Sequence, residues 1–109
     1  NDIYISVGSS IIGGEGNQIY YGSNDSNISG GTNNYIYDSN GSKLSGGSFN
    51  CIFTSDNANV IGGNQNRIIK YFDDESNYNP GNFIGGGNKN RDVQIQTTEM
   101  PWDTIHFIC

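Results

Sequence analysis

The side chains best suited to binding chemistry gather in one short segment, residues 71–79. This segment supplies Tyr71, Phe72, Asp73, Asp74, Glu75 and Tyr78. Carboxylate oxygens hold hard cations or accept hydrogen bonds from sugar hydroxyls, and aromatic rings pack against the faces of sugar rings. The sequence therefore predicts a ligand-binding segment here, with a surface carbohydrate as the expected ligand. The alternative is a solvated acidic loop that aids solubility.

Motifs for metals and phosphates are not matched in the rest of the chain. Gly13-Gly14-Glu15-Gly16-Asn17 resembles a calcium-binding nonapeptide, but Gln18 occupies the aspartate position. His106 is the only histidine, and neither C-x-x-C nor a phosphate-loop lysine motif occurs. No metal and no cofactor are expected. Cys51 and Cys109 permit either one disulfide or two free thiols.

Charge and composition narrow the classes of function further. The net charge is −6 and the five Lys and Arg residues are not clustered, which argues against nucleic acid and anionic membrane surfaces as partners. No apolar run approaches the roughly 20 residues of a membrane helix. Glycoside hydrolysis needs two carboxyl groups at a set separation, and no such pair is recognisable. We therefore expect a non-enzymatic protein.

The elements that must position these residues are repeats of the pattern I-x-G-G-x-x-N-x-I. With the first glycine of each pair as position 0, the copies start at Gly13, Gly30, Gly46, Gly62 and Gly86. The steps are 17, 16, 16 and 24 residues. Such a period is too short for paired helices and fits one coil of a solenoid, with two strands and two turns. The long step contains an insertion of about eight residues, so residues 71–79 are expected to project as a loop.

We predict an all-β protein, a β-solenoid (β-helix or β-roll) of five to six coils with about 16 residues each. Residues 1–98 form the solenoid, and residues 99–109 form a C-terminal cap of short strands. Position −2 and position +6 are apolar in successive copies, so both are expected to line the core. These residues are Ile28, Leu44 and Val60 at −2, with Ile36, Ile52 and Ile68 at +6.

Asparagine occupies position +4 in every copy: Asn17, Asn34, Asn50, Asn66 and Asn90. Strands in a stack are spaced by about 4.8 Å. At that distance the side-chain amides can bond to one another and to backbone groups at the turn. We therefore predict a structural asparagine ladder.

Position +7 follows a core position and so should face outward, yet it is apolar or aromatic. The column contains Tyr4, Tyr20, Tyr37, Phe53 and Ile69. An exposed apolar stripe usually marks an interface, so we predict a contact between chains. The alternative is that position +7 lies at a corner where its side chain tucks in.

Taken together, these Asn-, Gly- and Ser-rich coils resemble repeats of viral and phage tail-fibre or spike proteins, and more loosely the β-roll heads of trimeric autotransporter adhesins. The resemblance covers residues 1–93. It implies a homotrimer on a virion or outside the cell, which binds a host surface receptor or glycan or serves as a stiff stalk. Because the chain begins within a repeat, we expect it to be part of a longer protein. Two alternatives stay open, a polysaccharide-binding or -degrading tailspike fragment and a monomeric solenoid of an extracellular appendage or matrix.

Overall fold

The computed structural model describes residues 1–72 and 82–96, with side chains for residues 1–69 and 82–91. These residues form two parallel sheets and no helix. The six-stranded sheet has the order β1 (Asp2–Tyr4), β3 (Gln18–Tyr20), β5 (Tyr35–Tyr37), β7 (Cys51–Phe53), β9 (Arg67–Phe72) and β11 (Arg91–Gln96). The five-stranded sheet has the order β10 (Phe83–Ile84), β8 (Asn59–Val60), β6 (Lys43–Leu44), β4 (Asn27–Ile28) and β2 (Ser10–Ile11).

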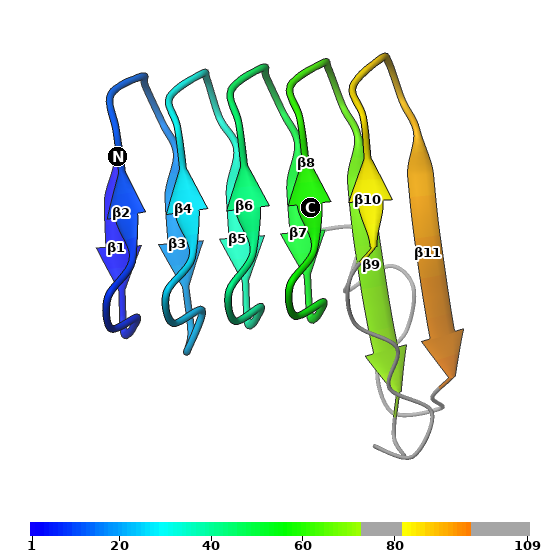
Figure 1. Cartoon of the computed structure of the whole chain (residues 1–109), viewed down its shortest axis with the longest axis horizontal. Helices are drawn as coiled ribbons and strands as arrows, with labels where there is room; N and C mark the ends of the chain where they lie inside the picture. The colour runs from blue at the N-terminus through cyan, green and yellow to red at the C-terminus, as the bar shows by residue number, and fades with distance from the viewer. Residues whose placement is uncertain (73–81, 97–109) are drawn as a thin grey trace.

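The chain winds as a β-solenoid, alternating between the two sheets (Figure 1). It makes about 4 turns of about 16 residues, so the predicted all-β solenoid and its period are confirmed, although five to six coils were predicted. The strand register also matches the repeat: Tyr35 pairs with Cys51 and Cys51 with Arg67, whereas Arg67 pairs with Arg91 across the long step. The predicted cap, residues 99–109, lies outside the described residues.

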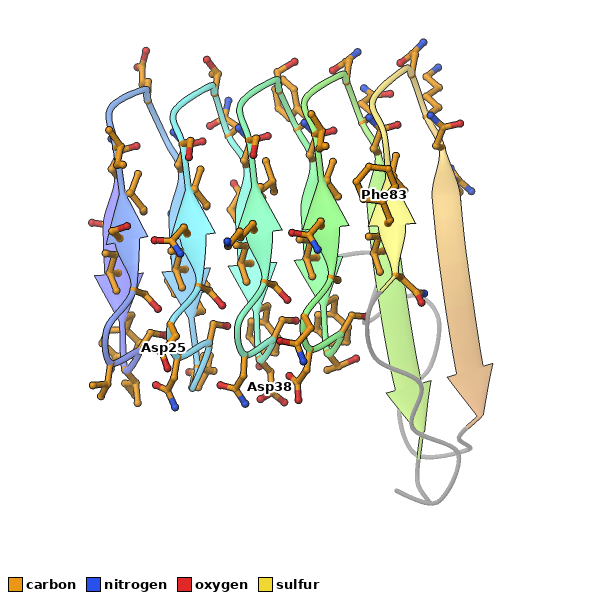
Figure 2. The ribbon with its side chains drawn as sticks, in the orientation of Figure 1. Asp25, Asp38 and Phe83 are labelled. Atoms are coloured by element: carbon orange, nitrogen blue, oxygen red, sulfur yellow. The ribbon has the colours of Figure 1, made fainter. Side chains whose placement is uncertain are left out.

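The core consists of the two predicted apolar columns, one on each sheet. Ile28, Leu44 and Val60 face Ile36, Ile52 and Ile68, and all six side chains are fully buried. Strand alternation is evident at β10, where Ile84 is buried and its neighbour Phe83 is 61% exposed on the outer face (Figure 2). Each coil contributes only two large side chains to the two columns, to which Ala58 adds a smaller one, so burial depends on the coils above and below.

Asparagine side chains at position +4 join the coils through a continuous series of hydrogen bonds. The backbone N–H of Asn50 donates to Asn34 Oδ1 at 3.0 Å, and Asn50 Oδ1 accepts from the N–H of Asn66 at 2.9 Å. Asn50 Nδ2 donates to the carbonyls of Gly46 and Gly63, at 3.3 and 3.1 Å. One residue therefore bonds to the coil before, its own coil and the coil after.

This ladder runs along the whole described stack. It includes Asn1, Asn17, Asn34, Asn50, Asn66 and Asn90. The first four members of the predicted column, from Asn17 to Asn66, are fully buried, whereas Asn90 at its end is exposed. Because a buried amide must find partners, the series fixes both the register and the spacing of the coils.

The glycine pair makes room for these bonds, and its two members do so differently. Both Gly46 and Gly47 have a left-handed backbone, with φ of +82° and +79°. A Cβ on Gly47 would overlap the carbonyl oxygen of Gly63 and lie 2.7 Å from Asn50 Nδ2. A Cβ on Gly46 would have nothing closer than Ser29 O, at 3.9 Å. The second glycine is therefore required by space as well as by φ.

A serine ladder holds the second turn, at the other end of the coil. Ser42 Oγ donates to the carbonyl of Ser55 at 2.8 Å and accepts from the N–H of Ala58 at 3.0 Å. Ser39 Oγ accepts from the N–H of Ser55 at 2.9 Å and donates to the carbonyl of Tyr37 at 2.8 Å. This ladder was not predicted from the sequence, although serine recurs at two fixed positions. Its fully buried members are Ser23, Ser26, Ser39 and Ser42.

The same turn has a left-handed residue at position −5, where glycine alternates with a larger residue. In chain order these are Gly8, Asp25, Gly41 and Asn57, all with positive φ. A Cβ on Gly8 would overlap Asp25 Oδ1, and a Cβ on Gly41 would lie 2.6 Å from Asn57 Oδ1. The side chains of Asp25 and Asn57 therefore each lie over the glycine at the same position of the preceding coil.

Alanine at the two glycines of one pair should have unequal effects. Both Gly46→Ala and Gly47→Ala place a Cβ at positive φ, which costs roughly 1–2 kcal/mol. Only Gly47→Ala forces a Cβ against backbone, so we expect it to lower the free energy of unfolding by at least about 2 kcal/mol more. Urea unfolding followed by circular dichroism measures the difference. Equal losses would mean that the coils are not stacked at this distance.

Replacing one ladder amide by a carboxylate should be severely destabilising. In Asn50→Asp, the Gly46 carbonyl loses its side-chain donor, at roughly 1–3 kcal/mol, and a charge is buried. The Gly63 carbonyl loses the Asn50 amide but keeps the N–H of Ser48. We expect a loss of at least about 3 kcal/mol at neutral pH. Asn64→Asp makes the same chemical change at an exposed side chain and is the control. A similar Tm for the two variants would contradict the ladder.

Candidate functional site

The predicted ligand-binding segment begins as a strand rather than a loop. Tyr71 and Phe72 belong to β9, where they pair with Ile95 and Gln96 of β11. The prediction that Tyr71 and Phe72 belong to a projecting loop was therefore wrong. The pairing of β9 with β11 continues beyond the length of the earlier strands. The remaining predicted ligand-binding residues, Asp73, Asp74, Glu75 and Tyr78, lie outside the described residues.

The predicted interface stripe is exposed at only one end. Tyr4 is 54% exposed and Tyr20 and Tyr37 are half-buried, but Phe53 and Ile69 are fully buried within the single chain. The expectation that one chain leaves the whole column uncovered is therefore wrong at Phe53 and Ile69. An accessible aromatic surface remains over the first three coils.

That surface is a cluster of four tyrosines: Tyr4, Tyr20, Tyr21 and Tyr37. Ring centroids lie 6.4 Å apart for Tyr4 and Tyr20, 6.0 Å for Tyr4 and Tyr21, and 5.3 Å for Tyr21 and Tyr37. Tyr37 stacks in turn on buried Phe53 at 5.0 Å. The tyrosine cluster is thus one connected group of rings, anchored at one end on a buried ring.

Tyr21 is the member of this cluster that was not predicted from the sequence. It follows Tyr20 directly, and strict strand alternation would turn it away from the column. Its backbone is left-handed, with φ of +51°, as it is at Ile5, Asp38 and Thr54 in the same position, +8, of other coils. The strand ends there, so the side chain of Tyr21 lies on the same side as that of Tyr20. The available signal was the adjacent Tyr-Tyr pair itself.

Two carboxylates border the tyrosine cluster. Burial raises the pKa of Tyr20, with a further contribution from the charge of Asp2. Burial likewise raises the pKa of Tyr37, to which Tyr21 and Asp38 contribute through their charges. The phenols of Tyr20 and Tyr37 therefore stay neutral at physiological pH, and acidic side chains lie beside them.

Asp38 is the exposed acidic residue that follows Tyr37. It lies in a turn at the end of the coil opposite the glycine pairs (Figure 2), with φ of +47°. Partial burial raises the pKa of its carboxyl group above the usual value, and the charge of Asp56 raises it further. The fold thus holds this carboxylate against both desolvation and a like charge.

Cys51, Arg67 and Arg91 lie beyond this surface, on the strands that follow. Cys51 is fully buried and takes part in a disulfide, so the free-thiol alternative is wrong for it. Cys109 lies outside the described residues. Burial and the charge of neighbouring Arg91 both lower the pKa of Arg67. Positive charge therefore belongs to the later coils.

Over residues 1–72 and 82–96, no three His, Cys, Asp or Glu residues group as metal ligands do. In the same part of the chain, no helix of sufficient length and apolar character to span a membrane is found. Comparison with known protein families, curated proteins and solved structures found no match. A function must therefore be inferred from the surface of the solenoid itself.

Removing the charge of Asp38 should stabilise the fold in a pH-dependent way. Its pKa is higher in the folded chain than in the unfolded chain, so the folded state binds the proton more tightly. The free energy of unfolding should fall as the pH rises from about 3.8 through the folded-state pKa. Asp38→Asn removes this fall, so its Tm should exceed that of the unchanged chain at pH 7 and match it below about pH 3.8. Thermal unfolding at both pH values measures this, and equal Tm values at pH 7 would contradict it.

Proposed function

We propose that this chain is a structural and receptor-binding segment of an extracellular or virion fibre, without enzymatic activity. The observation that carries the proposal is the continuous asparagine ladder from Asn1 to Asn90, in which each coil is bonded to the next by the same geometry. A stack with repeated polar and apolar columns is stiff along its axis, since every coil constrains its neighbours. A stalk that carries a binding surface needs this property.

The division between inner and outer positions supports the same proposal. Inner positions are restricted to Ile, Leu, Val, Ala, Asn and Ser, because they line the core or form the ladders. Outer positions differ from coil to coil, as at position +8, where Ile5, Tyr21, Asp38 and Thr54 succeed one another. Solenoids can vary such positions without altering the stack, which suits the recognition of a partner along an extended surface.

The proposal includes a homotrimer, because the resemblance to fibre proteins implies one. The mass of the particle in solution tests it. A trimer should give a light-scattering mass three times the 11.9 kDa of one chain. A fluorescent form of the chain should also bind to cells or immobilised glycans in a saturable manner. A chain that remains monomeric and attaches to no surface would overturn the fibre proposal.

A further inference from the structure

The tyrosine cluster has the composition and exposure of a contact surface. Tyr4 is 54% exposed and Tyr21 is 51% exposed, while Tyr20 and Tyr37 are half-buried beside them. Ring contacts with one another and with Phe53 restrict the positions of these side chains. A partner that binds here meets aromatic surface that is already ordered, so little further side-chain entropy is lost.

The charge of the surrounding coils is of one sign. Residues 1–42 contain Asp2, Glu15, Asp25 and Asp38 but no Lys, Arg or His. The first basic side chain, Lys43, is on β6 of the other sheet. The carboxylates that act on Tyr20 and Tyr37 are those of Asp2 and Asp38. No basic residue precedes either of them in the sequence, and Lys43 follows Asp38 on the strand of the other sheet.

Asp38 is an exposed acidic residue at the border of the cluster. The next coil has uncharged Thr54 at the same position, with nearly the same backbone, φ of +48° against +47°. The turn therefore does not require a carboxylate. A charge that opposes both burial and its neighbour Asp56 suggests a role in binding rather than in folding.

The ring geometry favours a cation over the flat face of a sugar. The planes of neighbouring tyrosines meet at 87° for Tyr4 and Tyr20 and at 63° for Tyr20 and Tyr21. Steeply inclined rings do not make a continuous platform, but they present ring faces on which a guanidinium or ammonium group is stabilised by the π-electrons. The carboxylates at the border add Coulomb attraction.

A second copy of the chain complements this surface poorly. In a parallel three-fold assembly, each copy presents the same coil at the same height along the axis. At the height of the three coils that carry the tyrosine cluster, each neighbouring copy would offer Asp2, Glu15, Asp25 and Asp38 against one basic side chain, Lys43. Most of the opposite charge must therefore come from a different molecule.

We propose that the tyrosine cluster, with Asp2 and Asp38, binds an arginine- or lysine-bearing segment of a partner protein. Guanidinium or ammonium groups lie against the faces of Tyr4, Tyr21 and Tyr37, and Asp38 pairs with one of them. The inference rests on the proposed attachment function and names the partner of that function.

Positions of the repeat supply substitutions that the fold already accepts elsewhere. Tyr21→Thr introduces the residue that Thr54 provides at position +8, and Asp38→Asn removes only the charge. Phe49→Gln, which copies Gln65, is the matched control for Tyr21→Thr, because Phe49 is 52% exposed and also has a left-handed backbone. Glu15→Gln is the control for Asp38→Asn, since Glu15 is exposed at the glycine end of the coil.

The experiment measures binding of a labelled peptide of alternating Arg and Gly by fluorescence anisotropy, with a Glu-Gly peptide as the negative probe. We expect saturable binding of the Arg-Gly peptide that weakens as salt increases. Tyr21→Thr and Asp38→Asn should each weaken it about tenfold or more, whereas Phe49→Gln and Glu15→Gln should leave it within about twofold. Because Asp38→Asn is expected to stabilise the chain, its lost binding cannot be ascribed to unfolding.

Three results would overturn the inference: no binding of the Arg-Gly peptide, equal weakening by a variant and its control, or binding of the Glu-Gly peptide with similar affinity. The attachment assay separates this failure from failure of the proposed function. Saturable attachment to cells or neutral glycans that Tyr21→Thr leaves unchanged would retain a fibre role and reject the cationic partner. A concentration-dependent mass increase that Tyr21→Thr abolishes would assign the tyrosine cluster to self-association instead.

Discussion

The hydrogen bonds of the buried asparagine amides are the constraint on which the rest of the structure depends. Each amide must reach the carbonyls of two successive coils, so the coils must lie at one distance and in one register. That requirement explains why Gly47 and its equivalents have no room for a side chain. It also explains how a chain with only 33% hydrophobic residues folds, since the same register brings two apolar side chains per coil into continuous columns.

Most of the architecture could be predicted because chemical type recurs at fixed positions. Asn at +4, Gly at 0 and +1, and Ile at +6 define the register of the coils, and the strand pairs follow it. The ends of the elements were less predictable. Tyr71 and Phe72 are strand residues because a later coil extends to pair with them, and such pairing between distant segments is not evident from local sequence.

Only part of the candidate surface could be predicted from the sequence, for two physical reasons. Outward direction at position +7 follows from strand alternation, but exposure depends on what else covers the strand, and Phe53 and Ile69 are covered. Tyr21 was not predicted because the alternation of side chains ends where the backbone becomes left-handed. The turn geometry sets that backbone conformation, and the residue type at the position does not reveal it. The result is a shorter aromatic surface than the column predicts, concentrated where the chain lacks basic residues.

The alternation of small and large residues at the left-handed turn position bears on how such a chain can lengthen or shorten. The side chain of Asp25 lies over Gly8, and that of Asn57 lies over Gly41. Loss of the coil with Gly41 would bring Asp25 and Asn57 into adjacent layers, whereas loss of the coil with Asp25 would bring Gly8 and Gly41 together. Loss or duplication of two consecutive coils preserves the alternation. Changes of length by two coils should therefore disturb this turn least.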